Sequence, residues 1–165
     1  MRDYLKGLSY EKRDEVIEGL IEKFNLKEKI NQIPKEAWKL MTRFELLEFS
    51  KSKSVEIGSH GYLHFNMGNI DSASVQKELT LSKSLIEEVI NKPVNQIAFP
   101  DGSYSRDVID AAEKAGYQNQ LAVNYLKDED KNDFRILNRH GISSTTTYES
   151  NVLSINKAFF SKGYN

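Results

Sequence analysis

The sequence contains no cysteine among its 165 residues. Disulfide scaffolds, thiolate zinc sites and cysteine nucleophiles are therefore excluded, although this absence does not fix the cellular compartment. No stretch approaches the roughly 18 apolar residues that a membrane span needs. The first residues also lack the apolar region that is typical of a signal peptide. We expect no membrane span and no export signal, so the chain as printed reads as cytoplasmic and its location is otherwise unknown.

An excess of one charge sign is missing as well. The 23 lysine and arginine residues stand against 24 aspartate and glutamate residues, which leaves a formal net charge of -1. Proteins that bind nucleic acid through a broad basic field carry a large positive excess, so we expect no nucleic-acid partner. Hydrophobic residues make up 39% of the chain, enough for a buried core in one compact unit.

The sequence changes character near residue 50. Before it, Ser9 and the capping-box pair Thr42 and Glu45 predict helices, with a polar loop or a frayed helix end from residue 25 to 32. From Val55 onward, strand and helix patterns alternate, which is typical of parallel strands joined by crossover helices. Function in such α/β folds collects at the carboxyl ends of the strands. We expect strands at residues 55–57, 97–99 and 120–123 and a fourth within residues 135–142. We expect helices at 75–89, between Ser105 and Gly116, and at 148–160.

Two histidines four residues apart, His60 and His64, follow the first expected strand. Gly58 and Gly61 flank His60 and favour a turn or a single helical turn over a long helix. Either shape can bring two neutral imidazoles to about 2.0–2.1 Å from one divalent metal ion. Such a pair can also arise by chance and satisfy local hydrogen bonds. The position directly after a buried strand favours the metal-binding interpretation.

A tight turn follows the second expected strand. Pro100 fixes φ and Gly102 permits a positive φ, so the turn can aim backbone N–H groups into a pocket, as an oxyanion site requires. The alternative is an ordinary turn that joins a strand to a helix. Our candidate substrate contacts are Pro100, Asp101, Gly102 and Tyr104.

The third histidine, His140, lies on or near the fourth expected strand. A lone histidine in such a place is more often a core or rim residue than a catalytic one. The neighbouring Arg139 either pairs with a carboxylate or is solvated. His140 is our candidate catalytic residue, for a reason that the next motifs supply.

Several motifs, taken in order, resemble the NodB-homology polysaccharide deacetylases, which are carbohydrate esterase family four. Residues 55–64, V-E-I-G-S-H-G-Y-L-H, resemble the second family motif, H-S/T-x-x-H in an E-I-G-S-H context. Residues 78–89 and then 97–104, I-A-F-P-D-G-S-Y, resemble the run from an E-x-x-x-S-K helix to a F-A-Y-P-Y-G turn. Residues 111–117 resemble the helix and A-G-Y turn that follow. Residues 137–140, L-N-R-H, resemble the last motif, L-x-H, with one residue too many.

The resemblance spans roughly residues 42 to 142 and implies an incomplete or distorted (β/α) barrel with an extra N-terminal helical segment. It implies that residues 1–50 resemble an insertion before the histidine motif and that residues 51–165 form the deacetylase-like α/β domain. It also implies a divalent metal, usually zinc, held by His60, His64 and an aspartate. The mechanism that the resemblance implies is attack by a metal-activated water molecule on an acetyl group of a sugar polymer, with a second aspartate as base and His140 as acid.

Two departures from the family pattern stand out. The family opens with T-F-D-D, which supplies the base and the third metal ligand, whereas this sequence contains no Asp-Asp pair. Asp101 stands where the family turn commonly has tyrosine, and its carboxylate would repel an oxyanion or approach the metal. We therefore expect the chain as printed to lack the opening strands and to turn over weakly or not at all.

Three hypotheses follow for the function. The first is a metal-dependent hydrolase that removes acetyl groups from a carbohydrate, in a truncated form. The second is a non-catalytic carbohydrate-binding or interaction domain that keeps the deacetylase fold. The third is an unrelated small α/β protein with structural histidines. The strand edges that an incomplete barrel exposes also make a homodimer an expected partner arrangement.

Overall fold

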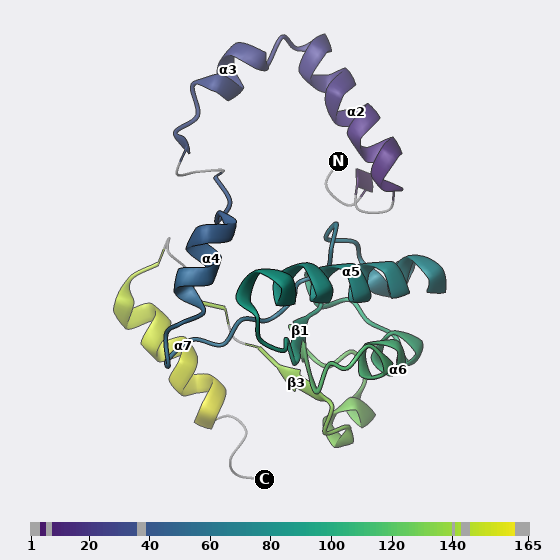
Figure 1. Cartoon of the computed structure of the whole chain (residues 1–165), viewed down its shortest axis with the longest axis vertical. Helices are drawn as coiled ribbons and strands as arrows, with labels where there is room; N and C mark the ends of the chain where they lie inside the picture. The colour runs from purple at the N-terminus through teal and green to yellow at the C-terminus, as the bar shows by residue number, and fades with distance from the viewer. Residues whose placement is uncertain (1–3, 6–7, 36–38, 140, 143–145, 161–165) are drawn as a thin grey trace.

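A three-stranded parallel sheet forms the centre of the computed structural model, which describes residues 4–5, 8–35, 39–139, 141–142 and 146–160 (Figure 1). The strands are β1 (Gln96–Ala98), β2 (Asn119–Ala122) and β3 (Ile136–Asn138), and they lie in sequence order. β1 pairs with β2 and β2 with β3, both in parallel. The three later strands predicted from the sequence are therefore confirmed, the last of them in a shorter form.

The first predicted strand, residues 55–57, is wrong. The only pairing in this part of the described chain is a single parallel bridge between Ser59 and Ile97. The N–H of Ser59 donates to Gln96 O, and the N–H of Ala98 donates to Ser59 O, both over 2.8 Å. The chain leaves the sheet immediately afterwards, because Gly61 adopts a φ of 85° and turns it away. The segment thus touches β1 at one point, on the side opposite β2.

Two helices cover one face of the sheet. α5 (Ser72–Ile90) begins at Asp71, whose carboxylate accepts the N–H of Ser74 over 3.0 Å, and it ends at the left-handed Asn91. α6 (Arg106–Lys114) is capped by Ser105. Gly116, with a φ of 89°, ends the turn after α6 as its sequence position predicts. α5 and α6 contact each other over the sheet.

The hydrophobic core lies between this helical layer and the sheet. Along each strand the buried residues alternate with more exposed ones, as a half-covered sheet requires. The other face carries a row of aligned apolar residues, Ala98, Leu121 and Leu137, and Leu137 is 44% exposed. The core residues are Met67, Val75, Leu79, Ile90, Val94, Ile97, Phe99, Tyr104, Val108, Ile109, Ala112, Tyr117, Ala122 and Ile136.

The N-terminal helices form an arch that stands away from the sheet (Figure 1). They are α2 (Tyr10–Lys23), α3 (Lys27–Asn31) and α4 (Arg43–Phe49). Ser9 caps α2 and the Thr42–Glu45 capping box opens α4, as predicted. α3 corrects the expectation of a loop at residues 25–32, because its lysine and glutamate residues favour a helix even without an apolar face. Of the residues described before Ser50, none is buried.

Polar contacts join the arch to the α/β part at both ends. Arg43 of α4 forms a 2.6 Å ion pair with Glu88 of α5. Arg13 of α2 donates to the carbonyl oxygen of Leu63 over 3.3 Å.

The last helix, α7 (Tyr148–Phe160), has the bounds that the sequence pattern predicts. None of the helices in the described residues is both long and apolar enough to cross a membrane. The division of the chain at residue 50 stays a prediction.

Candidate functional site

The rings of His60 and His64 meet at the carboxyl end of the sheet. Their centroids are 4.8 Å apart and their planes are nearly perpendicular, at 84°. The loop between them reverses at Gly61, and His64 itself has a positive φ of 59°. This conformation is costly for a residue other than glycine, and it turns the second imidazole back toward the first. The structure therefore brings together the two histidines that the sequence singles out.

The ring of His60 is fixed by a backbone group of β1. Its Nδ1 lies 2.6 Å from the carbonyl oxygen of Ala98. A carbonyl oxygen only accepts, so Nδ1 carries the proton and the Nε2 lone pair is available to a ligand. Burial against the sheet is the main cause that lowers the His60 pKa, and the charges of His64 and Arg139 lower it further, while the Ala98 bond and Asp101 oppose them. The neutral imidazole that a metal ion requires is thus favoured.

The loop between the two histidines rests on α5. The N–H of Tyr62 donates to Glu78 Oε2 over 2.8 Å, and the N–H of Leu63 lies 3.0 Å from each oxygen of the same carboxylate. The N–H of Gly61 donates to the Ser59 hydroxyl over 3.2 Å. Side chains therefore accept the three successive N–H groups that separate His60 from His64.

The turn after β1 forms as predicted but uses much of its backbone internally. Residues Pro100–Gly102 make a short 3-10 turn in which the N–H of Gly102 donates to Phe99 O and that of Ser103 to Pro100 O, each over 3.0 Å. Pro100 and Gly102 are buried, whereas Asp101 is exposed with a φ of 54°. A Cβ on Gly102 would lie 2.9 Å from Val123, so the turn needs glycine there. An oxyanion donor at the Asp101 backbone stays a prediction.

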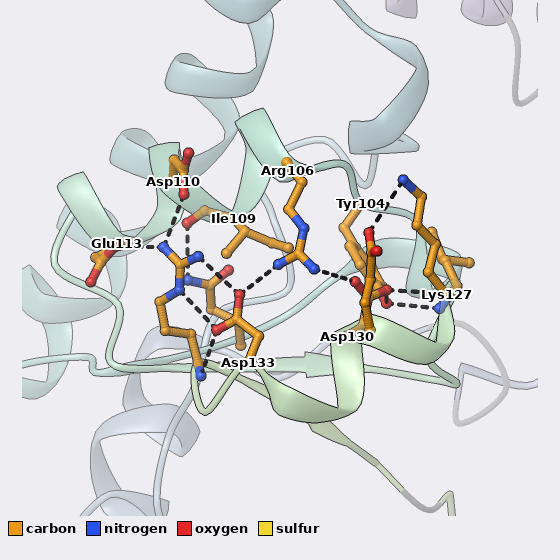
Figure 2. A network of polar contacts seen from close by, with 12 residues as sticks. Tyr104, Arg106, Ile109, Asp110, Glu113, Lys127, Asp130 and Asp133 are labelled. Atoms are coloured by element: carbon orange, nitrogen blue, oxygen red, sulfur yellow. Dashed lines mark hydrogen bonds and ion pairs between the residues drawn. The ribbon is translucent and has the colours of Figure 1, made fainter.

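Tyr104 lies in the interior, only 6% exposed. Its hydroxyl donates to the buried carboxylate of Asp130 over 2.7 Å and accepts the N–H of Leu126 over 2.8 Å (Figure 2). Burial is the main cause that raises the pKa of Tyr104 to about 12. Asp130 also accepts the guanidinium of Arg106 over 2.7 Å. The structure thus gives Tyr104 a role in joining the segment after the Pro100–Gly102 turn to the loop after β2, and a substrate contact from this side chain stays a prediction.

Arg139 follows β3 and reaches across the carboxyl ends of the other strands. Its N–H donates to Ala122 O over 2.8 Å, and its guanidinium donates to Phe99 O over 3.2 Å. The sequence offered a carboxylate partner or solvent, and the structure shows a backbone carbonyl instead. The adjacent His140, our candidate catalytic acid, lies outside the described residues, so its role stays a prediction.

The described side chains fit part of a metal site. Zinc commonly takes imidazole ligands. The hydrogen bond of His60 Nδ1 to Ala98 O fixes the orientation of one of these two rings. Within the described ranges, three or more histidine or acidic side chains nowhere gather as a metal cluster. Zinc sites usually use three or four protein ligands, so the pair supplies two positions of a larger set.

A comparison with known families supports the reading of these motifs. The sequence profile of the family described as polysaccharide deacetylase matches residues 23–120. The chain belongs to the polysaccharide deacetylase family. YxkH of Bacillus subtilis (strain 168), which bears a polysaccharide deacetylase name, is 31% identical over 64 residues, or 39% of this chain and 23% of YxkH.

Solved deacetylase structures share the fold. BC0361, a polysaccharide deacetylase from Bacillus cereus, is 26% identical with a TM-score of 0.56, over 69% of this chain and 36% of that one. The Streptococcus pyogenes deacetylase PplD, solved with acetate, is 22% identical with a TM-score of 0.53, over 66% of this chain and 48% of that one. This chain therefore spans less than half the length of these relatives. The predicted incomplete α/β barrel of the polysaccharide deacetylase type is confirmed.

Sequence reasoning gave no role in this site to Glu78 and missed the contact that Arg139 makes. Glu78 is a charged residue on the apolar face of α5, between Val75 and Ser82, and this position was a signal of buried polar contacts. The contact of Arg139 with Phe99 O had no sequence signal, because it depends on how β1 and β3 lie in the folded sheet.

Proposed function

We propose that this chain carries the histidine half of a metal-dependent site that removes acetyl groups from a carbohydrate. The observation that supports the proposal is the edge-to-face meeting of His60 and His64, with His60 Nδ1 bound to Ala98 O. The membership of the polysaccharide deacetylase family supports this reaction class. Zinc is the expected ion, because imidazole ligands suit it.

The residues at the carboxyl end of the sheet have different proposed roles in this reaction. When bound, a divalent metal supplies Lewis acidity, which polarises an acetyl carbonyl and lowers the pKa of water. His60 and His64 would hold this ion, and Ala98 O keeps His60 in the tautomer that leaves Nε2 free to bind. The charge of Arg139 favours an anionic group near His60, and Asp101 adds a carboxylate to the same end of β1. His140 is proposed as the acid that protonates the leaving group.

The level of activity follows from the donor set. Two imidazoles hold zinc less tightly than three or four ligands do, and the printed sequence contains no Asp-Asp pair. General-base help is typically worth roughly 10²–10⁴ in rate. We therefore propose slow turnover for the chain as printed. The two-ligand set also favours a second candidate, a carbohydrate-binding domain that retains the deacetylase fold without turnover.

Acetate release tests this proposal. The printed chain is incubated with zinc and either an N-acetylglucosamine pentamer or an O-acetylated xylo-oligosaccharide, and acetate is quantified. We expect slow release that is lost in His60→Ala and His64→Ala. Oligosaccharide binding without any acetate release would favour the second candidate. Robust release that survives both substitutions would show that the histidine pair is not the reaction site.

A further inference from the structure

Beneath the exposed pair His60 and His64 lies a buried acid, Glu78. This residue is only 2% exposed, in the middle of α5. Among the described residues no lysine, arginine or histidine forms an ion pair with it. Burying a carboxylate is costly unless hydrogen bonds replace its water, so this position must meet a specific demand.

That demand comes from the loop that carries both imidazoles. The N–H groups of Tyr62 and Leu63 point at the Glu78 carboxylate, at 2.8 Å and 3.0 Å. An apolar residue in place of Glu78 would leave these two partly buried backbone donors without their acceptor. Charge-assisted bonds of this kind are also stronger than bonds to a neutral acceptor.

Gly61 is shaped to the same carboxylate. A Cβ built on Gly61 would lie 2.8 Å from Glu78 Oε2 and 3.0 Å from the Met67 side chain. The loop backbone at this position therefore lies closer to the Glu78 carboxylate than a residue other than glycine would allow. One helical turn further along α5, the hydroxyl of Ser82 accepts the Ser59 hydroxyl over 2.8 Å. Glu78 and Ser82 thus hold the loop from one face of α5.

We propose that Glu78 is a positioning residue that sets the relative placement of the His60 and His64 rings. It acts through the backbone of Tyr62 and Leu63, and within the described part of the chain no hydrogen bond or ion pair joins its carboxylate to either ring. One consequence of this inference, a tighter metal site, rests on the proposed metal role of the two histidines. The placement of the rings by Glu78 does not. Loss of such an outer contact typically costs roughly 10–100-fold in metal affinity.

The test uses the full chain and two readouts besides activity. In metal-free protein, ¹⁵N spectra of the imidazoles report the ring environments of His60 and His64, and zinc titration calorimetry reports affinity. Glu78→Gln retains the size of the side chain but replaces one acceptor oxygen with a donor. We expect shifted signals for both rings and zinc affinity that is roughly 10–100-fold weaker. Glu78→Asp, which keeps the charge, should recover part of both.

Val108→Ala is the matched control for simple loss of stability. Val108 is buried in α6, 3% exposed, and is not among the loop contacts. It should lower Tm while leaving ring signals and zinc affinity unchanged. Unchanged ring signals in folded Glu78→Gln would overturn the proposal, and so would equal changes in Val108→Ala.

A measurement on the unmodified chain covers the case in which Glu78→Gln does not fold. Hydrogen exchange of the Tyr62 and Leu63 amides should be slow, and exchange at the rate of exposed amides would overturn the proposal. If the unmodified chain binds no zinc, the proposed metal function fails, while the ring signals and amide exchange still decide the role of Glu78.

Discussion

The guanidinium of Arg13 and the carbonyl oxygen of Leu63, fifty positions apart in the sequence, form a hydrogen bond of 3.3 Å. The same guanidinium lies 5.4 Å from the centre of the Phe65 ring. Because the N–H of Leu63 is held by Glu78, this residue is bound on one side by α5 and on the other by α2. The N-terminal arch therefore restrains the histidine loop from outside.

Replacing Arg13 should loosen this loop without weakening the core. In Arg13→Ala we expect lower ¹⁵N order parameters for residues 63–65 and a stability loss of about 1 kcal/mol. Arg43→Ala, which breaks the exposed pair with Glu88, is the control and should leave the loop unchanged. Unaltered order parameters in Arg13→Ala would mean that α2 does not restrain the loop.

Gly61→Ala should be clearly destabilising. Its φ of 85° and the 2.8 Å approach to Glu78 Oε2 leave no room for a methyl group. We expect a loss of roughly 1–3 kcal/mol in a denaturant titration. Gly19→Ala is the matched control, because a Cβ there meets nothing within 4 Å, and in the α2 helix it should stabilise by about 0.5–1 kcal/mol. Equal effects of the two substitutions would contradict the geometry of the loop.

Acid should weaken the ion network around Asp133. Its hydrogen bonds with Arg135 are the main cause that lowers the Asp133 pKa from 3.8 to about 2. A carboxyl with a lowered folded-state pKa stabilises the fold above about pH 4, and this contribution is lost as the pH falls toward 2. Asp133→Asn should lower the free energy of unfolding by roughly 1–2 kcal/mol at neutral pH. It should also reduce the further loss of stability between about pH 4 and pH 2. Glu129→Gln, in an exposed pair, should change neither measurement appreciably.

The open face of the sheet should drive self-association. Parallel sheets are usually covered on both faces, yet Leu137 is 44% exposed in a row with Leu121 and Ala98. β3 also pairs with β2 alone among the described strands. We expect light scattering at micromolar concentration to show a dimer, and Leu137→Glu to return it to a monomer. A monomeric unmodified chain at those concentrations would contradict this expectation.

Local patterns predicted much of this fold. Caps at Ser9, Thr42 and Ser105, the terminator Gly116 and the bounds of α7 follow from side-chain chemistry within a few residues. Long-range geometry was out of reach. Residues 55–57 have strand propensity, but a strand needs a partner along its length, and only Ser59 finds one in the described chain.

The candidate site shows the same division. The spacing and glycines of the histidine loop predicted that His60 and His64 converge. Glu78, the buried acid that supports the loop, lies 14 positions beyond His64 in the sequence. It contacts the loop only when α5 packs on the sheet. Tyr104 was named as a candidate substrate contact of the turn, and no local pattern indicated that its hydroxyl binds Asp130, in a loop 26 positions later.

Zinc titration of the unmodified chain and three histidine variants tests the central claim most directly. The account predicts weak binding of about one zinc ion per chain, with affinity reduced at least roughly tenfold in His60→Ala and in His64→Ala. His140→Ala should bind as the unmodified chain does, since that residue is proposed to move a proton rather than to hold the metal. Zinc binding that is unchanged in both His60→Ala and His64→Ala would contradict the account.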